Sequence, residues 1–497
     1  MYDLLLRGAT VIDGHGGAPF RADVGVRGDR IAAVGQLEAA AATRVIDLGG
    51  LAIAPGFIDA HTHDDRLLLA EPDMTPKLSQ GVTTVVAGNC GVSLAPLGRH
   101  AAVPPINLVA SPDGPHFESF RAYFEALEGA PPAVNVAAMV GHTTLRAVTM
   151  DDLERRANAR EIAAMQAHVA EALASGALGV STGTFYAPAS AADREEIVRV
   201  LEPLRGTGAI IASHIRDEGN RVLEALEEVT SIAREIGVRQ VVSHHKVQGR
   251  LNFGRSRETL EFLDVARSRG EVCLDCYPYV ASSTILRADS VRQASRVLVA
   301  WSTAAPEAAG RFLDELAKEQ GVSVDELIPR LQPAGAIYFS MDEADVERIL
   351  AYPETMVGSD GLPHDRFPHP RLWGTFPRVL GHYCRERKLF PLETAIHKMT
   401  GLPATRFGLA DVGFVKAGLR ADLTVFDPAT VIDAASFEAP TKPARGIMGV
   451  YVGGALAWSD GAGAGPRRGK VLRRRDCPAG PLPLASVRQR QNDIKEE

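Results

Sequence analysis

The spacing of hydrophobic and polar residues changes near residue 56. Before this point, short apolar runs joined by Gly and Asp turns predict a series of strands over 1–55. From Phe57 onward, short apolar runs alternate with long amphipathic stretches such as 193–208 and 220–237, and both of these end on Gly, as helices often do. This alternation is typical of a parallel sheet or barrel built from βα units.

Eight of the short apolar runs end in polar residues. They are FIDAHTH (57–63), VTTVVAGNC (82–90), VNVAAMVGHTT (134–144), ALGVSTG (177–183), IIASHIR (210–216), QVVSHHK (240–246), VCLDCYPY (272–279) and TMVGSDG (355–361). Eight βα units predict an α/β fold of the (β/α)8 TIM-like barrel type over 56–407. In such a barrel the active site lies at the carboxyl ends of the strands, where these polar residues fall.

Two further regions complete the predicted layout. An insertion at about 285–350, between the seventh and eighth strands, is expected to contain helices and to cover the barrel mouth as a lid. Strand-like sequence returns after Gly408, and neither end of the chain makes a persuasive core alone. We therefore expect 1–55 and 408–480 to form one small β-sandwich domain, followed by a tail at 481–497.

Charge and composition narrow the class of protein. The 497 residues carry 54 basic and 61 acidic side chains, a net charge of −7, which argues against nucleic acid as a partner. The one basic run, 467–476, is expected to be a solvated surface segment. Neither a signal peptide nor a membrane span is expected from the sequence. Five cysteines do not make a disulfide framework, so we expect a cytoplasmic protein.

Histidines gather at the predicted strand ends. His61 and His63 are two residues apart on an extended segment, so both imidazoles face the same side, and neutral imidazole is a common metal ligand. His214 and His244 occupy equivalent positions at the ends of the fifth and sixth runs. His245 should face the opposite way. Together the four histidines predict a metal site.

Two other strand ends supply different chemistry. Asp360, at the end of the eighth run, is placed to ligate a metal and to transfer protons as a general base and acid. Cys90 ends the second run, and its thiolate would suit zinc. Cys273 and Cys276 are three residues apart in a strand and face opposite sides, so they are interpreted as core or wall residues. His142 is interpreted as structural.

These motifs resemble the amidohydrolase superfamily over the whole chain. The strings APGFIDAHTH, GNCG, SHIRDEG, SHHK, YPY and GSDGLPHDRFPHPRLWGTFPRVLG resemble those of the N-acyl-D-amino-acid deacylases, also called D-aminoacylases. The resemblance implies a tight zinc held by Cys90, His214 and His244. It implies a second, weaker site at His61, His63 and Asp360. Many relatives with two metals bridge them with a Lys or Glu after the third or fourth strand, and neither residue occurs at those strand ends here.

The implied reaction is hydrolysis of an N-acyl-D-amino acid, a small molecule, by zinc-activated water. Asp360 would accept the proton and deliver it to the departing nitrogen. Recognition of the substrate α-carboxylate is expected from Lys246 and Arg287, with Tyr186 in the pocket wall. Tyr277 would donate either to that carboxylate or to the tetrahedral oxyanion. Arg366 and Arg371 would face an acidic substrate side chain if the enzyme took one, although the expected preference is for neutral, apolar D-amino acids.

Three alternatives remain open from the sequence. A dihydropyrimidinase or hydantoinase on the same scaffold would need a lysine to carboxylate after the third or fourth strand. A scaffold protein without activity would be expected to lack metal ligands, and every ligand position is filled here. A purely structural zinc site would be closed, whereas the second site and Asp360 suggest an open one. The preference for D over L substrates follows only from the resemblance, and the oligomeric state is not predicted.

Overall fold

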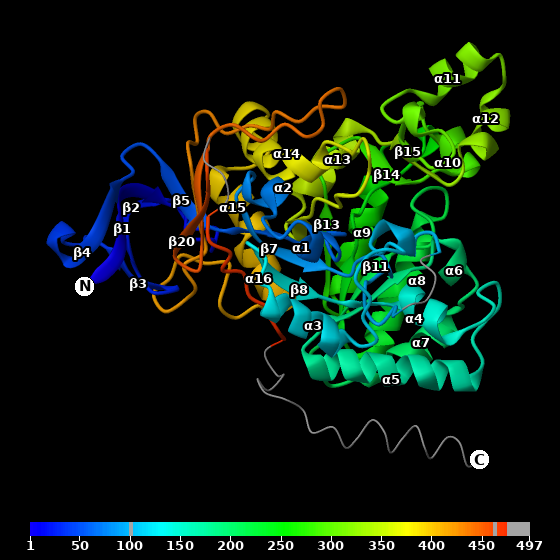
Figure 1. The fold of residues 1–497 in the computed structure, drawn as a ribbon, viewed down its shortest axis with the longest axis horizontal. Helices are drawn as coiled ribbons and strands as arrows, with labels where there is room; N and C mark the ends of the chain where they lie inside the picture. The colour runs from blue at the N-terminus through cyan, green and yellow to red at the C-terminus, as the bar shows by residue number, and fades with distance from the viewer. Residues whose placement is uncertain (99–102, 461–464, 475–497) are drawn as a thin grey trace.

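The two ends of the chain meet in one sheet. The computed structural model describes residues 1–98, 103–460 and 465–474, so the predicted tail at 481–497 lies outside the described residues. Eight strands form this sheet in the order β20-β19-β18-β5-β1-β2-β3, with β4 beside β1, at the left of Figure 1. They are β1 (Tyr2–Val11), β2 (Phe20–Arg27), β3 (Arg30–Gly35), β4 (Ala42–Asp47), β5 (Ala52–Pro55), β18 (Leu423–Phe426), β19 (Ile447–Val452) and β20 (Ala455–Ser459).

The link between the two ends is the antiparallel pair β5 and β18, in which Ile53 lies opposite Val425. Leu4, Leu6 and Leu423 belong to the same buried apolar cluster, so residues from both ends share a core. This is the pairing of chain ends that the sequence pattern suggests. A two-layered β-sandwich stays a prediction, because the strands are hydrogen-bonded as a single sheet among the described residues.

Parallel strands make up the centre of the molecule. One sheet contains β6 (Phe57–Asp59), β7 (Val82–Ala87) and β8 (Asn135–Ala138). The other has the order β17-β13-β12-β11-β10-β9. Its strands are β9 (Val140–Gly141), β10 (Gly179–Gly183), β11 (Ile210–His214), β12 (Arg239–Val242), β13 (Val272–Cys276) and β17 (Thr355–Val357).

Backbone hydrogen bonds join these two sheets at both sides. Leu178 N, just before β10, donates to Ala138 O of β8 at one side, and Ala60 N donates to Val357 O at the other, at 2.9 and 3.2 Å. A parallel bridge between Thr62 and Gly361 extends the second junction. Each of the eight predicted runs therefore lies between two parallel neighbours.

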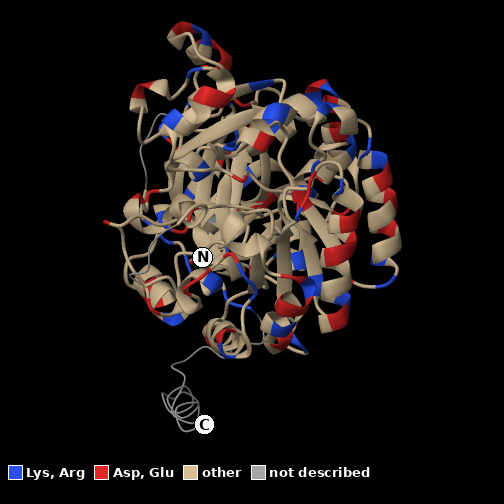
Figure 2. Cartoon of the chain, turned by 90° about the vertical axis from the view of Figure 1, so that its right-hand side faces the viewer, with Lys and Arg blue, Asp and Glu red and all other residues tan. Residues whose placement is uncertain are grey.

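Helices surround the parallel strands. The main ones are α3 (Phe120–Gly129), α4 (His142–Thr149), α5 (Ala159–Ser175), α7 (Arg194–Leu201), α8 (Val222–Ile236), α9 (Ser256–Arg267), α14 (Arg371–Arg378), α15 (Leu392–Met399) and α16 (Gly401–Phe407). Shorter ones are α1 (Leu67–Ala70), α2 (Thr75–Leu78) and α6 (Ala187–Ser190). Figure 2 shows that many charged residues lie along the outer helices, as expected for helices that bury an apolar face.

The helix ends follow local sequence signals. The Asn158 side chain caps α5 together with Glu161, and Gly237 ends α8 in a left-handed conformation. The stretch 193–208 is less regular than predicted, because α7 ends at Leu201 and Pro203 lies in a short 3-10 turn. Within the described residues, no helix combines the length and apolar character needed to cross a bilayer.

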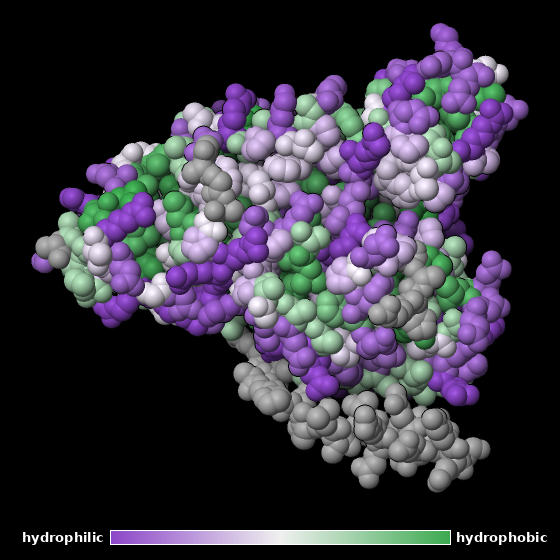
Figure 3. All heavy atoms as spheres, in the orientation of Figure 1, coloured by the Kyte–Doolittle hydropathy of each residue, from purple (hydrophilic) through white to green (hydrophobic). Residues whose placement is uncertain are grey.

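The insertion between β13 and β17 begins earlier than predicted and contains strands as well as helices. Its antiparallel sheet has the order β14 (Ala281–Ile285), β16 (Ala334–Phe339), β15 (Arg296–Ser302). Its helices are α10 (Ala288–Gln293), α11 (Leu313–Gln320), α12 (Val324–Leu331) and α13 (Glu343–Ala351). Figures 1 and 3 show the part with α11 and α12 projecting from the body as a lobe.

The basic run near the C-terminus is more integrated than predicted. Within its described part, Gly469 N donates to Pro132 O at 3.0 Å, and Leu472 N donates to Val136 O at 2.7 Å. Val136 also forms a parallel bridge with Val471. This segment therefore lies along β8, and the expectation of a merely solvated segment is wrong for residues 469–472.

Candidate metal centre

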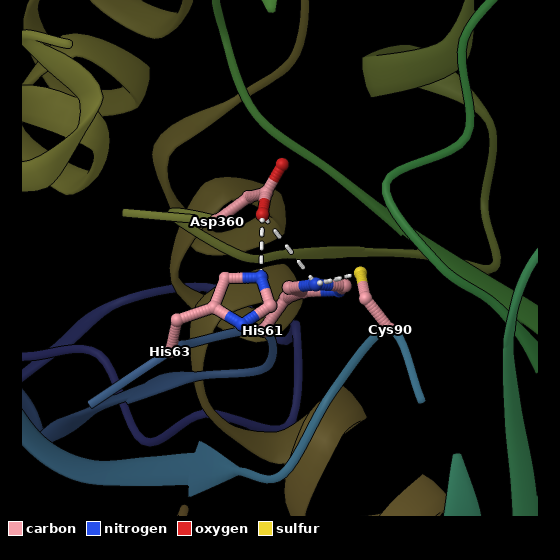
Figure 4. A group of neighbouring side chains, drawn as sticks. All are labelled: His61, His63, Cys90 and Asp360. Atoms are coloured by element: carbon pink, nitrogen blue, oxygen red, sulfur yellow. Dashed lines mark hydrogen bonds and ion pairs between the residues drawn. The ribbon is translucent and has the colours of Figure 1, made fainter. Parts of the chain in front are cut away.

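Four predicted ligands meet where the first, second and eighth runs end. His61 and His63 follow β6, Cys90 follows β7 and Asp360 follows β17. Their ligand atoms lie within 4.8 Å of one another, and all four side chains are buried. Figure 4 shows them converging, with Asp360 Oδ1 at 3.1 Å from His63 Nε2 and 3.6 Å from His61 Nε2.

Cys90 also belongs to a second group, with His214 and His244. Its Sγ lies 3.2 Å from His244 Nε2, and that nitrogen lies 2.9 Å from His214 Nδ1. Two imidazole nitrogens and one sulfur form a donor set that suits zinc, and three protein ligands leave the fourth position for water or substrate. The residues present therefore fit a catalytic zinc.

Backbone strain is concentrated at these residues. Among the described residues, five non-glycine residues have positive φ, and three of them are predicted ligands: Cys90 at 53°, His244 at 35° and Asp360 at 49°. Left-handed backbone costs free energy for such residues and persists where the surroundings enforce it, commonly at functional sites. The backbone thus turns sharply at the points where these side chains must enter the site.

The surroundings of Cys90 favour its thiolate. Burial alone would raise the pKa of its thiol, but the positive charges on His244 and His61 outweigh burial and hold that pKa well below its usual value. Cys273 shows the opposite case, since burial raises the pKa of its thiol to about 12. Cys273 and Cys276 lie in apolar clusters, in line with their interpretation as core residues.

Asp360 is held as a carboxylate. Burial would raise its pKa, but the charge of Arg371 and a hydrogen bond with His63 keep the pKa well below the usual value. Arg371 Nη1 lies 2.8 Å from Asp360 Oδ2, and the arginine is fully buried. The idea that Arg371 faces a substrate side chain is therefore wrong for this structure, and Arg366 is exposed.

Two carboxylates behind the histidines were not predicted from the sequence. Asp275 Oδ1 accepts a hydrogen bond from His244 N at 2.8 Å and lies 3.2 Å from His61 Nδ1. Glu218 Oε1 lies 3.1 Å from His244 Nδ1. Carboxylates in such positions fix the orientation of metal-binding imidazoles. Both carboxylates lie inside motifs identified from the sequence, Asp275 in CLDC and Glu218 in SHIRDEG. Those motifs were interpreted through their cysteines and histidine alone.

Of the four predicted substrate-binding residues, three line one cavity and the fourth does not. A cavity opens beside the ligands, and Lys246, Tyr277 and Tyr186 line it. Lys246 Nζ donates to Glu218 Oε1 at 2.6 Å. Arg287 is not brought to the cavity wall, since it is paired with Asp289 at 2.6 Å and lies over the ring of Phe185, which does line the cavity.

The remainder of the cavity wall comes from several elements. It comprises His63, Cys90, Leu108, Phe185, His214, Glu218, His244, Gln248, Ser282, Ser283, Thr284, Ser290, Tyr338, Asp360 and Leu362. Tyr186 Oη lies 3.0 Å from Thr284 Oγ1, so the wall is closed by a contact between the end of β10 and the insertion. The insertion therefore forms part of this cavity.

Two further histidines lie away from the ligand set. His245 Nε2 lies 2.9 Å from Thr259 Oγ1 on α9, on the opposite side of its strand end from His244. His142 lies beside Glu196 of α7, with 3.6 Å between Nε2 and Oε1. Both positions agree with the structural roles expected for them.

Known proteins resemble this chain in sequence and in structure. The amidohydrolase family model matches residues 44–248 and 293–457. A D-aminoacylase of Alcaligenes xylosoxydans xylosoxydans is 58% identical over 95% of this chain and 98% of its own. An N-acyl-D-aspartate deacylase of the same organism is 53% identical over 95% of each chain.

A solved structure agrees with these sequence matches. The N-acyl-D-glutamate deacylase of Bordetella bronchiseptica, complexed with zinc and a phosphonate mimic of the tetrahedral intermediate, is 46% identical. It superimposes with a TM-score of 0.91 over 95% of this chain and 99% of its own. Since the family model covers well over half of the sequence and the relatives cover nearly all of it, the chain belongs to the amidohydrolase family.

Proposed function

We propose that this protein is a zinc-dependent deacylase that hydrolyses N-acyl-D-amino acids to a carboxylate and a free D-amino acid. The observation that carries the proposal is the Cys90, His214 and His244 donor set beside the Asp360 carboxylate, all at the wall of one cavity. The related deacylases support the choice of substrate. Zinc held by these three residues supplies Lewis acidity toward water and the amide carbonyl.

The residues around the cavity have separate roles in the proposed reaction. Asp360 accepts the proton of the attacking water and returns it to the amide nitrogen as the C–N bond breaks. Arg371 keeps this carboxylate ionised between cycles. Lys246 offers a buried positive charge for the substrate α-carboxylate. The second metal site at His61, His63 and Asp360 shares Cys90 with the first.

The finer points of the architecture belong to the same proposal. The eight parallel runs form one closed (β/α)8 barrel over 56–407, and the insertion that starts at β14 acts as a lid. Support comes from the hydrogen bonds that join both sides of the two parallel sheets, and from the insertion residues in the cavity wall. The strands within 1–55 and 423–459 form the β domain, whereas the described residues 469–472 lie along β8.

A substrate series tests the proposed reaction. We expect initial rates at N-acetyl-D-amino acids to exceed those at the L-isomers by at least about 100-fold on zinc-loaded protein. Among D-substrates, Met, Leu and Phe should be faster than Asp and Glu. The reason is that no arginine lines the cavity in the described residues, and Lys246, its only lysine, is the group proposed to bind the α-carboxylate rather than the side chain.

Two other results would contradict these expectations. Equal rates for the D- and L-series would refute the proposed stereochemistry. A preference for Asp or Glu would show that a cation reaches the substrate side chain and would overturn the predicted apolar preference. Side-chain ranking is measured as kcat/KM at a fixed zinc concentration.

Tyr277 is expected to donate a hydrogen bond to the substrate. Its hydroxyl is buried without a protein partner, and burial raises the pKa of the hydroxyl well above its usual value, so the proton stays in place. We expect Tyr277→Phe to lower kcat/KM by about 100-fold, the usual effect of losing one donor to a developing oxyanion. Tyr279→Phe is the matched control, because Tyr279 also has a buried hydroxyl without a partner but does not line this cavity. Similar kinetics for the two variants would refute the role of Tyr277.

A further inference from the structure

A buried lysine lies behind the ligands, outside the cavity. Lys77 is on α2, and its side chain is inaccessible to solvent. Its ammonium group donates to Asp59 Oδ2 and to Ser359 Oγ, both at 2.9 Å. Asp64 Oδ2 lies 3.2 Å from the same nitrogen. All three partners are fully buried as well.

Each partner is next to a residue of the metal centre. Asp59 comes two residues before His61, Asp64 follows His63 directly, and Ser359 precedes Asp360. Lys77 therefore links the ends of the first and eighth strands, which are 300 residues apart in the sequence at Asp59 and Ser359.

The network also determines the backbone path at Asp360. Asp59 Oδ1 accepts a hydrogen bond from Ser359 N at 2.7 Å, and Ser359 Oγ accepts one from Gly361 N at 3.2 Å. Asp360 N donates to His61 O at 2.8 Å. Ser359 and Asp360 are thus hydrogen-bonded to the first strand and the segment after it, and Gly361 forms a bridge with Thr62 there. The left-handed Asp360, whose φ is 49°, is held between these contacts.

A second buried lysine provides a comparison. Lys398 donates to Thr355 O and to Tyr352 O, at the opposite end of β17 from Asp360. Removing either charge from water carries a desolvation cost, so stability alone does not distinguish the two lysines. The positions of the two lysines do distinguish them, because only Lys77 is bonded to residues that flank the candidate ligands.

We propose that Lys77 is a positioning residue that holds the Asp360 carboxylate in its reactive place against His63. The proposal rests on the proposed function, in which Asp360 transfers the proton. Lys77 touches neither the cavity nor the ligand atoms, and it acts through Asp59, Asp64 and Ser359. Displacing a reacting group by about 1 Å is enough to cost about 100-fold in rate.

The test compares Lys77→Met with Lys398→Met on the full-length, zinc-loaded protein. For Lys77→Met we expect kcat per zinc-loaded molecule to fall by about 100-fold with KM changed by less than about twofold. For Lys398→Met, kcat per zinc-loaded molecule should stay within about twofold of the parent. Zinc content, measured by atomic absorption, should be unchanged in both, because the tight site is built from Cys90, His214 and His244.

Ser359→Ala keeps the proposal testable if Lys77→Met does not fold. This variant removes one partner of Lys77 and leaves both carboxylates paired. We expect kcat to fall by about tenfold at constant KM, and a crystal structure should show the Asp360 carboxylate displaced from His63. An unchanged kcat in Ser359→Ala, or equal kcat losses in Lys77→Met and Lys398→Met, would overturn the inference.

The outcomes also separate this inference from the proposed function. If Asp360→Asn abolishes turnover but Lys77→Met and Ser359→Ala keep the parental kcat, only the positioning role fails. If Asp360→Asn itself stays active, the role of Asp360 fails first.

Discussion

Replacing Asp360 by Asn or Ala is expected to lower kcat by at least about 1000-fold while the tight zinc remains bound. Among the described residues, two carboxylates line the cavity, Asp360 and Glu218, and Glu218 is paired with Lys246. Both changes therefore remove the one cavity carboxylate proposed to transfer the proton. Asn keeps the volume of the side chain and isolates the loss of proton transfer. The measurement is kcat at saturating N-acetyl-D-methionine, with zinc content measured on the same sample.

The two variants also differ in a useful way. Asp360→Ala leaves the Arg371 guanidinium buried without its partner, which should cost roughly 3–5 kcal/mol of stability. Asn still offers an oxygen to that guanidinium, so its melting temperature should lie closer to that of the parent. Substantial turnover in a folded, zinc-loaded Asp360→Asn protein would show that another group carries the proton.

Replacing Cys90 by Ala is expected to weaken zinc binding by more than about 100-fold and to remove activity with it. Replacing a residue that only contacts a metal ligand already lowers metal affinity or activity by about 10- to 100-fold. Cys90 is a direct ligand in this proposal, so a larger loss is expected. Its sulfur is shared by both groups of possible ligands, so its loss affects both sites. Competition with a chromophoric chelator measures the affinity.

Cys273→Ala is the control for that experiment. Cys273 is equally buried, but burial raises the pKa of its thiol to about 12 and it lies in an apolar cluster. We expect this variant to lose about 1 kcal/mol of stability and to keep its zinc and its activity. Full zinc binding by Cys90→Ala would mean that the histidines alone hold the metal.

The sequence could predict which side chains lie together at the candidate metal centre because strand geometry is regular. Side chains alternate along a strand, and the carboxyl ends of parallel strands meet at one edge. His61, His63, His214 and His244 could therefore be placed relative to one another from spacing alone. Cys90 was a candidate ligand from its place at the end of the second run, and the family resemblance implied that it holds the tight zinc. The structure brings its sulfur to 3.2 Å from two of these histidines.

The surrounding residues could not be placed in this way. Arg371 lies on α14, and the loop that brings it back to Asp360 has no periodic pattern. Lys77 lies on a helix of four residues, too short to show an amphipathic period. The strands of the insertion were not predicted, because only helices were expected there, whereas Ala281–Ile285 forms β14 and pairs with β16.

The pairing of β5 with β18 has a consequence for how the protein is made. Chains grow from the N-terminus at about 5–20 residues per second, so β18 leaves the ribosome tens of seconds after β5. During that interval β5 has an unpaired edge, and such edges favour association with other chains. Nascent chains that stall before residue 423 are thus the form of this protein most in need of a chaperone.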